Sequence, residues 1–151
     1  MSLTPHSPAA DAFAWPVRVY WEDTDAGGIV FYANYLKYFE RARTEWLRAL
    51  GIAQSTLREE SGCIFVVSDV QLKYLRPARL DDQLLVTVRL VEPGRSSFTL
   101  QQEARLLPPT QADTPPVVLC LGTVRVGCVN GESLRPTRIP PKVQYALQGQ
   151  A

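Results

Sequence analysis

The sequence is nearly without histidine. Its 151 residues include one, His6, which lies in an N-terminal segment rich in Pro, Ser and Ala. We expect residues 1–13 to form a disordered tail, which leaves no histidine in the folded part of the chain. Ser-His-Asp triads, Cys-His pairs and histidine metal sites are therefore excluded. Any catalysis must use carboxylates, tyrosines, backbone amides or bound water, and we expect no metal ion and no cofactor.

Cysteine is scarce as well. The three cysteines, Cys63, Cys120 and Cys128, are odd in number and show no Cys-x-x-Cys spacing, which argues against a disulfide framework and against a zinc site. Cys120 and Cys128 lie in an apolar run. We expect them to be buried small hydrophobic residues of a protein in a reducing compartment.

Excess charge and long apolar runs are also missing. The formal net charge is +1, so no overall field attracts nucleic acid or an anionic membrane. No stretch approaches the roughly 18 consecutive apolar residues of a membrane span, and the N-terminus lacks the basic and apolar regions of a signal peptide. We expect a cytoplasmic protein that neither binds nucleic acid nor spans a membrane.

One strong helix pattern is present, and it predicts a helix over about 33–50. Apolar residues recur there at spacings of three and four, which is typical of an amphipathic helix. They are Tyr35, Phe39, Ala42, Trp46 and Ala49/Leu50. Gly51 follows as a C-terminal stop.

Most of the remaining chain has the composition of strands. Residues 15–20 favour a first strand, and four longer segments rich in Val, Leu, Ile and Thr are separated by turn sequences, which indicates antiparallel neighbours. The longer segments are 63–74, 83–92, 97–107 and 117–129. We therefore predict an α+β domain over 14–140, with residues 141–151 as a C-terminal tail. One helix covers one face of such a sheet, and a second copy of the chain is the simplest cover for the rest.

The loop before the predicted helix carries the best candidates for chemistry. It contains Asp23, Asp25 and the pair Gly27-Gly28, which allows a tight turn and the close approach of a ligand. The helix start near Tyr32 presents free N–H groups that stabilise negative charge on a carbonyl oxygen. Ordinary loop and capping chemistry is the alternative explanation of the same residues.

Three motifs resemble the 4-hydroxybenzoyl-CoA thioesterase superfamily, and within it the acyl-CoA thioesterases associated with the bacterial Tol-Pal system. The longest runs from Val19 to Tyr35 and continues through residues 38–45. The others are residues 74–82 and 94–98. Together they cover the chain in order over roughly 15–140.

The resemblance implies a hotdog fold, in which a five-stranded antiparallel sheet wraps around one long helix. It implies hydrolysis of acyl-CoA thioesters, with Asp25 as nucleophile or general base and the backbone amide of Tyr32 polarising the thioester carbonyl. Gly28 and Phe31 become substrate-binding positions. Sites at subunit interfaces and a dimer of dimers are also implied, and acyl carrier protein is a further candidate partner.

Several side chains in these motifs allow two interpretations. Many members of the Tol-Pal group carry histidine where this chain has Tyr32, which affects substrate preference more than the role of the amide. Arg76, Arg79 and Arg95 suit the phosphates of CoA, with Arg95 the best single candidate, or are solvated surface residues. Glu40 belongs to a charged helix face or reaches the acyl pocket.

Asp23 is expected to hold the loop by local hydrogen bonds, and Phe39 and Trp46 to be core residues. Two rival functions remain. A hotdog dehydratase or hydratase relies on a catalytic histidine, which this chain lacks outside its tail. A non-catalytic module that binds acyl-CoA or acyl carrier protein is the rival from another class.

Overall fold

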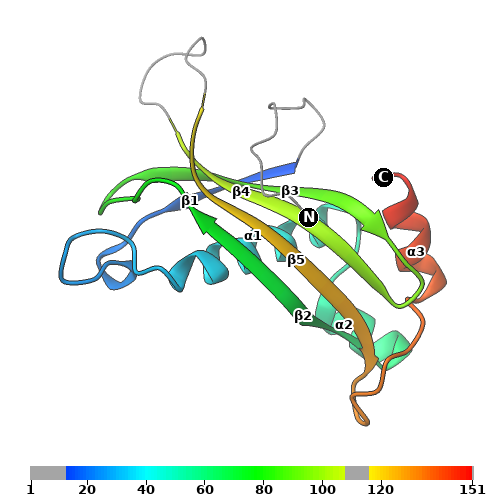
Figure 1. Ribbon diagram of the computed structural model, residues 1–151. Coiled ribbons are helices and arrows are strands. Elements are labelled where there is room, and N and C mark those ends of the chain that lie inside the picture. The colour runs from blue at the N-terminus through cyan, green and yellow to red at the C-terminus, as the bar shows by residue number, and fades with distance from the viewer. Residues whose placement is uncertain (1–12, 108–115, 151) are drawn as a thin grey trace.

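The helix predicted for residues 33–50 is present as α1 (Asn34–Ala49), and it lies against a five-stranded sheet (Figure 1). The computed structural model describes residues 13–107 and 116–150. The strands are β1 (Phe13–Arg18), β2 (Cys63–Tyr74), β3 (Gln83–Pro93), β4 (Ser97–Leu106) and β5 (Val117–Asn130). The other elements are the short 3-10 helix η1 (Trp21–Asp23), α2 (Gln54–Ser61) and α3 (Pro141–Gln148).

The sheet has the order β1-β3-β4-β5-β2, and every pair of neighbouring strands is antiparallel. The predicted antiparallel pairing is therefore confirmed. The expectation that successive strands are neighbours holds for β3, β4 and β5 but is wrong for β2, which pairs with β5. Residues 75–82 carry the chain from one edge of the sheet to its other half. As a result, β2 is an edge strand.

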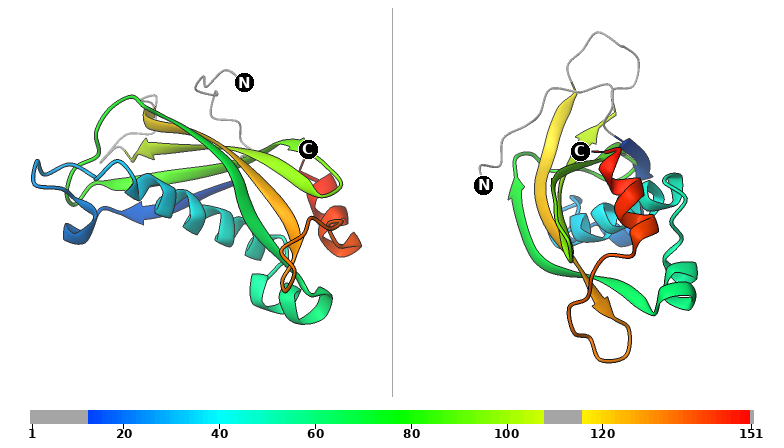
Figure 2. Two further views of the ribbon diagram at one scale, coloured as in Figure 1. Left: turned by 60° about the horizontal axis from the view of Figure 1, so that its bottom comes forward. Right: turned by 90° about the vertical axis from the view of Figure 1, so that its right-hand side faces the viewer.

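The sheet curls around α1, as the views in Figure 2 show, so the predicted hotdog arrangement is confirmed. The inner face of α1 includes Tyr38, Phe39 and Ala42, all fully buried. The Phe39 ring lies against Gly122 of β5 so closely that a Cβ at position 122 would come within 2.6 Å of the ring. Glycine at this position is therefore a packing requirement.

The structure contains two helices that the sequence analysis did not predict. Helix α2 buries one residue, Leu57, so it has little amphipathic pattern, and it ends at Gly62 in the left-handed region. Helix α3 begins with Pro141, a residue type that suits the first helical turn. It packs Val143 and Leu147 into the core. Residues 141–148 are thus a packed helix and not a tail. The N-terminal tail lies outside the described residues, apart from Phe13, which opens β1.

None of the helices in the ranges 13–107 and 116–150 is long and apolar enough to cross a membrane. The three cysteines are buried free thiols, and the burial of Cys120 and Cys128 was predicted. Cys63 and Cys128 lie on paired strands, where Phe65 is the direct partner of Cys128. Burial raises the pKa of Cys120 to about 12, and burial together with nearby Cys63 raises that of Cys128 to about 12.

A raised thiol pKa predicts slow reaction with a disulfide reagent in the folded protein, because the thiolate is the reactive form. At pH 8 we expect Cys120 and Cys128 to react with Ellman's reagent only after unfolding. The measurement compares thiol titration in buffer with titration in concentrated urea. Rapid reaction of these two thiols without denaturant would contradict their burial.

Candidate active site

The loop that carries Asp25 is a closed, hydrogen-bonded turn between η1 and α1. The Asp25 amide donates to the Ile29 carbonyl at 2.9 Å, and the Gly28 amide donates back to the Asp25 carbonyl at 3.0 Å. Gly28 has φ of 77°, which residues with a Cβ rarely adopt. The Asp25 carboxylate accepts a hydrogen bond from the Gly27 amide at 2.8 Å through Oδ1. The side chain is exposed, so Oδ2 remains accessible to substrate or water.

Asp23 is a structural residue, as the sequence predicted. It is buried, and its carboxylate accepts the Tyr20 amide at 2.8 Å. Its carbonyl accepts both the Phe31 amide at 2.9 Å and the Asn34 side-chain amide at 2.7 Å. Burial and the nearby Asp23 carboxylate raise the pKa of Tyr38 above its usual value, although the Tyr38 hydroxyl does not reach hydrogen-bond geometry. Asp23 therefore ties η1 to the start of α1.

The start of α1 offers an unused backbone donor. The N-cap residue is Ala33, which has no side chain that can cap the helix. Among the described residues the Tyr32 amide makes no hydrogen bond to a backbone carbonyl, although the Asn34 amide closes the turn on the Phe31 carbonyl at 2.8 Å. The Tyr74 hydroxyl, at the end of β2, donates to the Tyr32 carbonyl at 2.8 Å. The turn is thus fixed from the sheet while the Tyr32 amide stays free for a ligand oxygen.

Asp25 and Tyr32 line two separate hollows of the surface. The hollow at Asp25 measures about 430 Å³ and the hollow at Tyr32 about 310 Å³. The first is lined by Trp21, Thr24, Asp25, Ala26, Gly28 and Leu80. The second is lined by Ile29, Val30, Tyr32, Tyr35, Tyr74, Leu75, Arg76 and Pro77. The lining of the first hollow includes Gly28, and that of the second begins with Ile29, the next residue in the chain. Phe31 is exposed between them, with its ring 4.7 Å from that of Tyr32.

The structure places two of the candidate arginines beside Ile29 and separates the third from them. Arg76 lines the hollow at Tyr32, and the backbone of Arg79 forms a bridge with Ile29. Arg95 follows β3, whose opposite end pairs with β1 next to the Asp25 loop. The eleven residues of β3 place Arg95 roughly 33 Å away from that loop within one chain. Arg95 instead lines a hollow of about 470 Å³ together with Arg138, which the sequence analysis did not single out.

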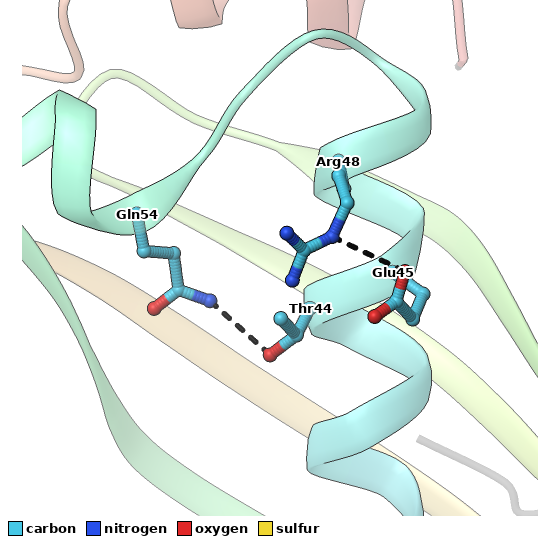
Figure 3. A network of polar contacts seen from close by, with 4 residues as sticks. All are labelled: Thr44, Glu45, Arg48 and Gln54. Carbon is cyan, nitrogen blue, oxygen red and sulfur yellow. Dashed lines mark hydrogen bonds and ion pairs between the residues drawn. The ribbon is translucent and has the colours of Figure 1, made fainter.

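The charged face of α1 differs from the predicted pairing. The expected Glu40–Arg43 and Arg41–Glu45 pairs are absent among the described residues. The ion pair on this helix joins Glu45 to Arg48 at 3.2 Å (Figure 3). Glu40 is exposed and lines a hollow beneath β2.

Phe39 and Trp46 are buried core residues, as predicted. Both lie on the α1 face that packs against the sheet, and Trp46 contacts Phe98 of β4 with ring centroids 6.3 Å apart. The site therefore stands on a rigid helix that is anchored in the core.

Comparison with known proteins decides the family. Residues 19–147 match the model of the Thioesterase-like superfamily, which spans both the Asp25 loop and α3. The chain belongs to this superfamily. Curated relatives that match most of the chain are named acyl-CoA thioesterases, so this protein is a thioesterase, and the resemblance inferred from its three motifs is confirmed.

Relatives of the thioesterase share most of its length. The chain is 42% identical over 137 residues to "Acyl-CoA thioesterase YbgC" of Haemophilus influenzae, covering 91% of this chain and 95% of that protein. It is 37% identical over 131 residues to "Acyl-CoA thioester hydrolase YbgC" of Escherichia coli O157:H7, covering 87% and 92%.

Solved structures show the same fold. A probable thioesterase from Bartonella henselae aligns with a TM-score of 0.74 at 30% identity, covering 85% of this chain and 99% of that one. A 1,4-dihydroxy-2-naphthoyl-CoA thioesterase from Synechocystis aligns with a TM-score of 0.77 at 20% identity, covering 91% and 96%. The hotdog assignment of the thioesterase therefore agrees with both architecture and comparison.

Proposed function

We propose that this thioesterase hydrolyses acyl-CoA thioesters, with Asp25 as the catalytic carboxylate and the Tyr32 amide as the oxyanion donor. The observation that carries the proposal is the unpaired Tyr32 amide at the start of α1, seven residues after a carboxylate with one accessible oxygen. The positive end of the α1 dipole adds to the field at this amide. The named relatives act on acyl-CoA, which supports the choice of thioester.

Two routes lead from this geometry to products. In the first, an Asp25 oxygen attacks the thioester carbon, the C–S bond breaks, and CoA leaves as a thiolate that takes up a proton. Water then hydrolyses the mixed anhydride and restores the carboxylate. In the second, Asp25 accepts a proton from a water molecule that attacks the carbonyl carbon directly. In both routes the Tyr32 amide stabilises the negative charge that develops on the carbonyl oxygen.

The proposed assembly is a homo-oligomer, with dimers formed along β2. This edge strand exposes Val66, Val67 and Val70, and a second β2 would cover them and pair the free backbone groups. A dimer of dimers, as the resemblance implies, would bring Arg95 and Arg138 of one chain toward a site on another. These arginines, together with Arg76 and Arg79, are the proposed contacts of the CoA phosphates.

Acyl carrier protein as an alternative acyl donor and a cytoplasmic location are further parts of the proposal. The acyl carrier protein carries its acyl group on a phosphopantetheine thiol, as CoA does. Asp25 and the Tyr32 amide would therefore act on both thioesters. The cytoplasmic location is supported by the free thiols of the three cysteines, which suit a reducing compartment.

The proposal is tested by release of free CoA thiol from a panel of short, long and aromatic acyl-CoAs. We expect saturable turnover with at least one member. Binding of acyl-CoA without thiol release from any member would favour the non-catalytic binding module instead. The panel also ranks the acyl groups, which reports the effect of tyrosine at position 32.

Tyr74 is predicted to be a positioning residue, because its hydroxyl holds the Tyr32 carbonyl. Tyr74→Phe removes this hydrogen bond and keeps the ring that contacts Tyr35. We expect kcat to fall by about 2- to 12-fold, the equivalent of one hydrogen bond, with KM changed less than twofold.

Steady-state kinetics and thermal unfolding of Tyr74→Phe separate a positioning role from a structural one. A fall in kcat at constant melting temperature supports positioning of the oxyanion donor. An increase in KM alone, or an unchanged kcat, would contradict it. Tyr145→Phe is the matched control, because Tyr145 is 80% exposed on α3.

A further inference from the structure

A hollow of about 240 Å³ lies beneath β2, apart from the Asp25 and Tyr32 hollows. Its floor is aromatic, with the Phe65 and Phe98 rings in edge contact at 5.4 Å, and its polar wall is formed by α1. Its lining comprises Glu40, Arg43, Thr44, Trp46, Leu47, Gln54, Phe65, Val66, Val67, Phe98, Leu100 and Val126. An apolar cavity of roughly 150 Å³ holds a benzene ring, so this hollow has room for a small acyl group.

Arg43 is a partly buried cation on the wall of this hollow without an anionic partner. Its guanidinium donates to the Gln102 side chain at 3.0 Å, and among the described residues no carboxylate oxygen lies within 4.0 Å of it. Burial lowers the pKa of Arg43, which nearby Glu40 partly offsets. Arginine has five N–H donors, so most of the guanidinium is available to a group bound in the hollow.

Arg48, about one and a half helical turns further along α1, has the surroundings usual for a surface arginine. It is exposed and paired with Glu45, as Figure 3 shows. Gln54 of α2 bonds to Thr44 at 3.4 Å in the same view, which fixes the rim of the hollow. Keeping a partly buried charge whose hydrogen bond goes to a neutral amide costs free energy, and an anionic ligand would reduce that cost.

The dimer proposed along β2 places this hollow next to a catalytic turn. Antiparallel pairing of two copies of β2 sets the Tyr74 end of each strand beside the Cys63 end of the other. Tyr74 holds the turn that contains Tyr32, and Phe65 and Val66 line the hollow near the Cys63 end. Each catalytic turn thus faces the hollow of the partner, whereas Arg43 of the same chain lies roughly 16 Å further along α1.

We propose that this hollow receives the far end of the acyl group held by the partner's catalytic turn, and that Arg43 selects acyl groups ending in a carboxylate. The inference rests on the proposed acyl-CoA hydrolysis and on the dimer along β2. The ligand class is the ω-carboxylated acyl-CoA of short chain length, whose methylene groups contact the aromatic floor while the carboxylate bonds to the guanidinium.

A carboxylate suits Arg43 better than a hydroxyl or a methyl group. It accepts two parallel hydrogen bonds from the planar guanidinium and neutralises its charge. Glu40 is exposed at the rim, where water screens its repulsion. A hydrocarbon end leaves the guanidinium unpaired, and a hydroxyl supplies an oxygen without charge.

The test compares three acyl-CoAs that have the same length from the thioester carbon to the terminal heavy atom and differ in the group at that end. These are adipoyl-CoA, its uncharged shape analogue 6-methylheptanoyl-CoA, and 6-hydroxyhexanoyl-CoA. We expect kcat/KM for adipoyl-CoA to exceed that of 6-methylheptanoyl-CoA by about 10- to 100-fold, which corresponds to a charged hydrogen-bonded contact. Equal values, or a preference for the hydroxyl substrate, overturn the proposal even though hydrolysis itself is established. No turnover of any acyl-CoA overturns the proposed function as well.

Variants assign the preference to Arg43. Arg43→Gln should reduce the adipoyl to methylheptanoyl ratio of kcat/KM to about one, because the amide lacks the charge that distinguishes the two. Arg48→Gln is the matched control and should keep the wild-type ratio. Glu40→Gln, at an exposed position that does not threaten folding, should raise the ratio by about threefold. A wild-type ratio in Arg43→Gln, or a lower ratio in Glu40→Gln, contradicts the assignment.

Mixing two variants tests whether the hollow serves the partner. Asp25→Asn lacks the carboxylate and Arg43→Gln lacks the selecting cation, so a mixed dimer has one site in which both are intact. After unfolding and refolding together, equal amounts should recover about a quarter of the wild-type adipoyl-CoA turnover, because half of the dimers are mixed and have one intact site each. Recovery no greater than the mean of the separate variants would overturn the shared site.

Discussion

Asp25→Asn is expected to lower kcat for acyl-CoA hydrolysis by roughly 10²–10⁴-fold, the usual contribution of a positioned acid–base or nucleophilic group. Asparagine keeps the size of the side chain, and its carbonyl oxygen can still accept the Gly27 amide that now bonds to Oδ1 at 2.8 Å. The loop therefore keeps its shape. What is lost is the charge that attacks the thioester or takes a proton from water. Release of CoA thiol, measured under saturating substrate, reports the change.

The control for this substitution is Glu22→Gln, which removes an exposed carboxylate from η1, three residues before Asp25. It should keep kcat within a factor of about two, because surface substitutions away from the site have small effects. Both variants should unfold at the wild-type temperature. If Asp25→Asn keeps the full rate, Asp25 is not the catalytic carboxylate, whatever the family. Single-turnover measurements with and without a trapping nucleophile then distinguish an anhydride from direct attack by water.

Among the substitutions considered, Phe39→Ala is expected to lower the free energy of unfolding most, by about 3–5 kcal/mol. The ring is fully buried on the inner face of α1, and it lies over Gly122, where a Cβ would approach to 2.6 Å. Position 122 has no side chain that could fill the space left by the ring. Urea unfolding followed by circular dichroism gives the difference.

Leu36→Ala provides the comparison for Phe39→Ala, since Leu36 lies on the same helix and is 41% exposed. Its cost should stay below about 1 kcal/mol. The contact with Gly122 can be tested separately. Gly122→Ala should destabilise the wild type by about 1–3 kcal/mol through overcrowding, and by less when Phe39 is already alanine. Equal costs in both backgrounds would show that the ring is not the group that Cβ meets.

Much of this fold follows from the spacing of apolar residues. The period of Phe39, Ala42 and Trp46 predicts α1 because every one of these side chains is buried on one face. Strand limits were predicted closely because Val- and Leu-rich segments alternate with turn sequences; β2, for example, runs over Cys63–Tyr74 as expected. Local sequence carries these signals because they arise from neighbouring residues.

The remaining features depend on contacts between distant residues. The pairing of β2 with β5 is fixed only when the sheet closes around α1, so no pattern in the local sequence predicts it. The same holds for the position of Arg95, whose motif suggests a ligand contact while the strand direction carries it to the far end of β3. The role of Tyr74 depends on a hydrogen bond to a residue 42 positions away. Helix α3 was missed because two buried residues, Val143 and Leu147, are too few to define a period.

At the start of α1, the stability of the helix and the proposed hydrolysis place different demands on the same position. A serine or aspartate at the N-cap commonly adds about 1 kcal/mol to the stability of a helix, yet Ala33 occupies that position without a capping side chain. A capping oxygen there would accept from the amides of residues 35 or 36, and it would place a further electronegative atom near the Tyr32 amide, where negative charge is proposed to develop during hydrolysis. With Ala33 the first turn of α1 is less stable than it would be with a capping residue. Selection for heat resistance would therefore oppose selection for turnover at position 33.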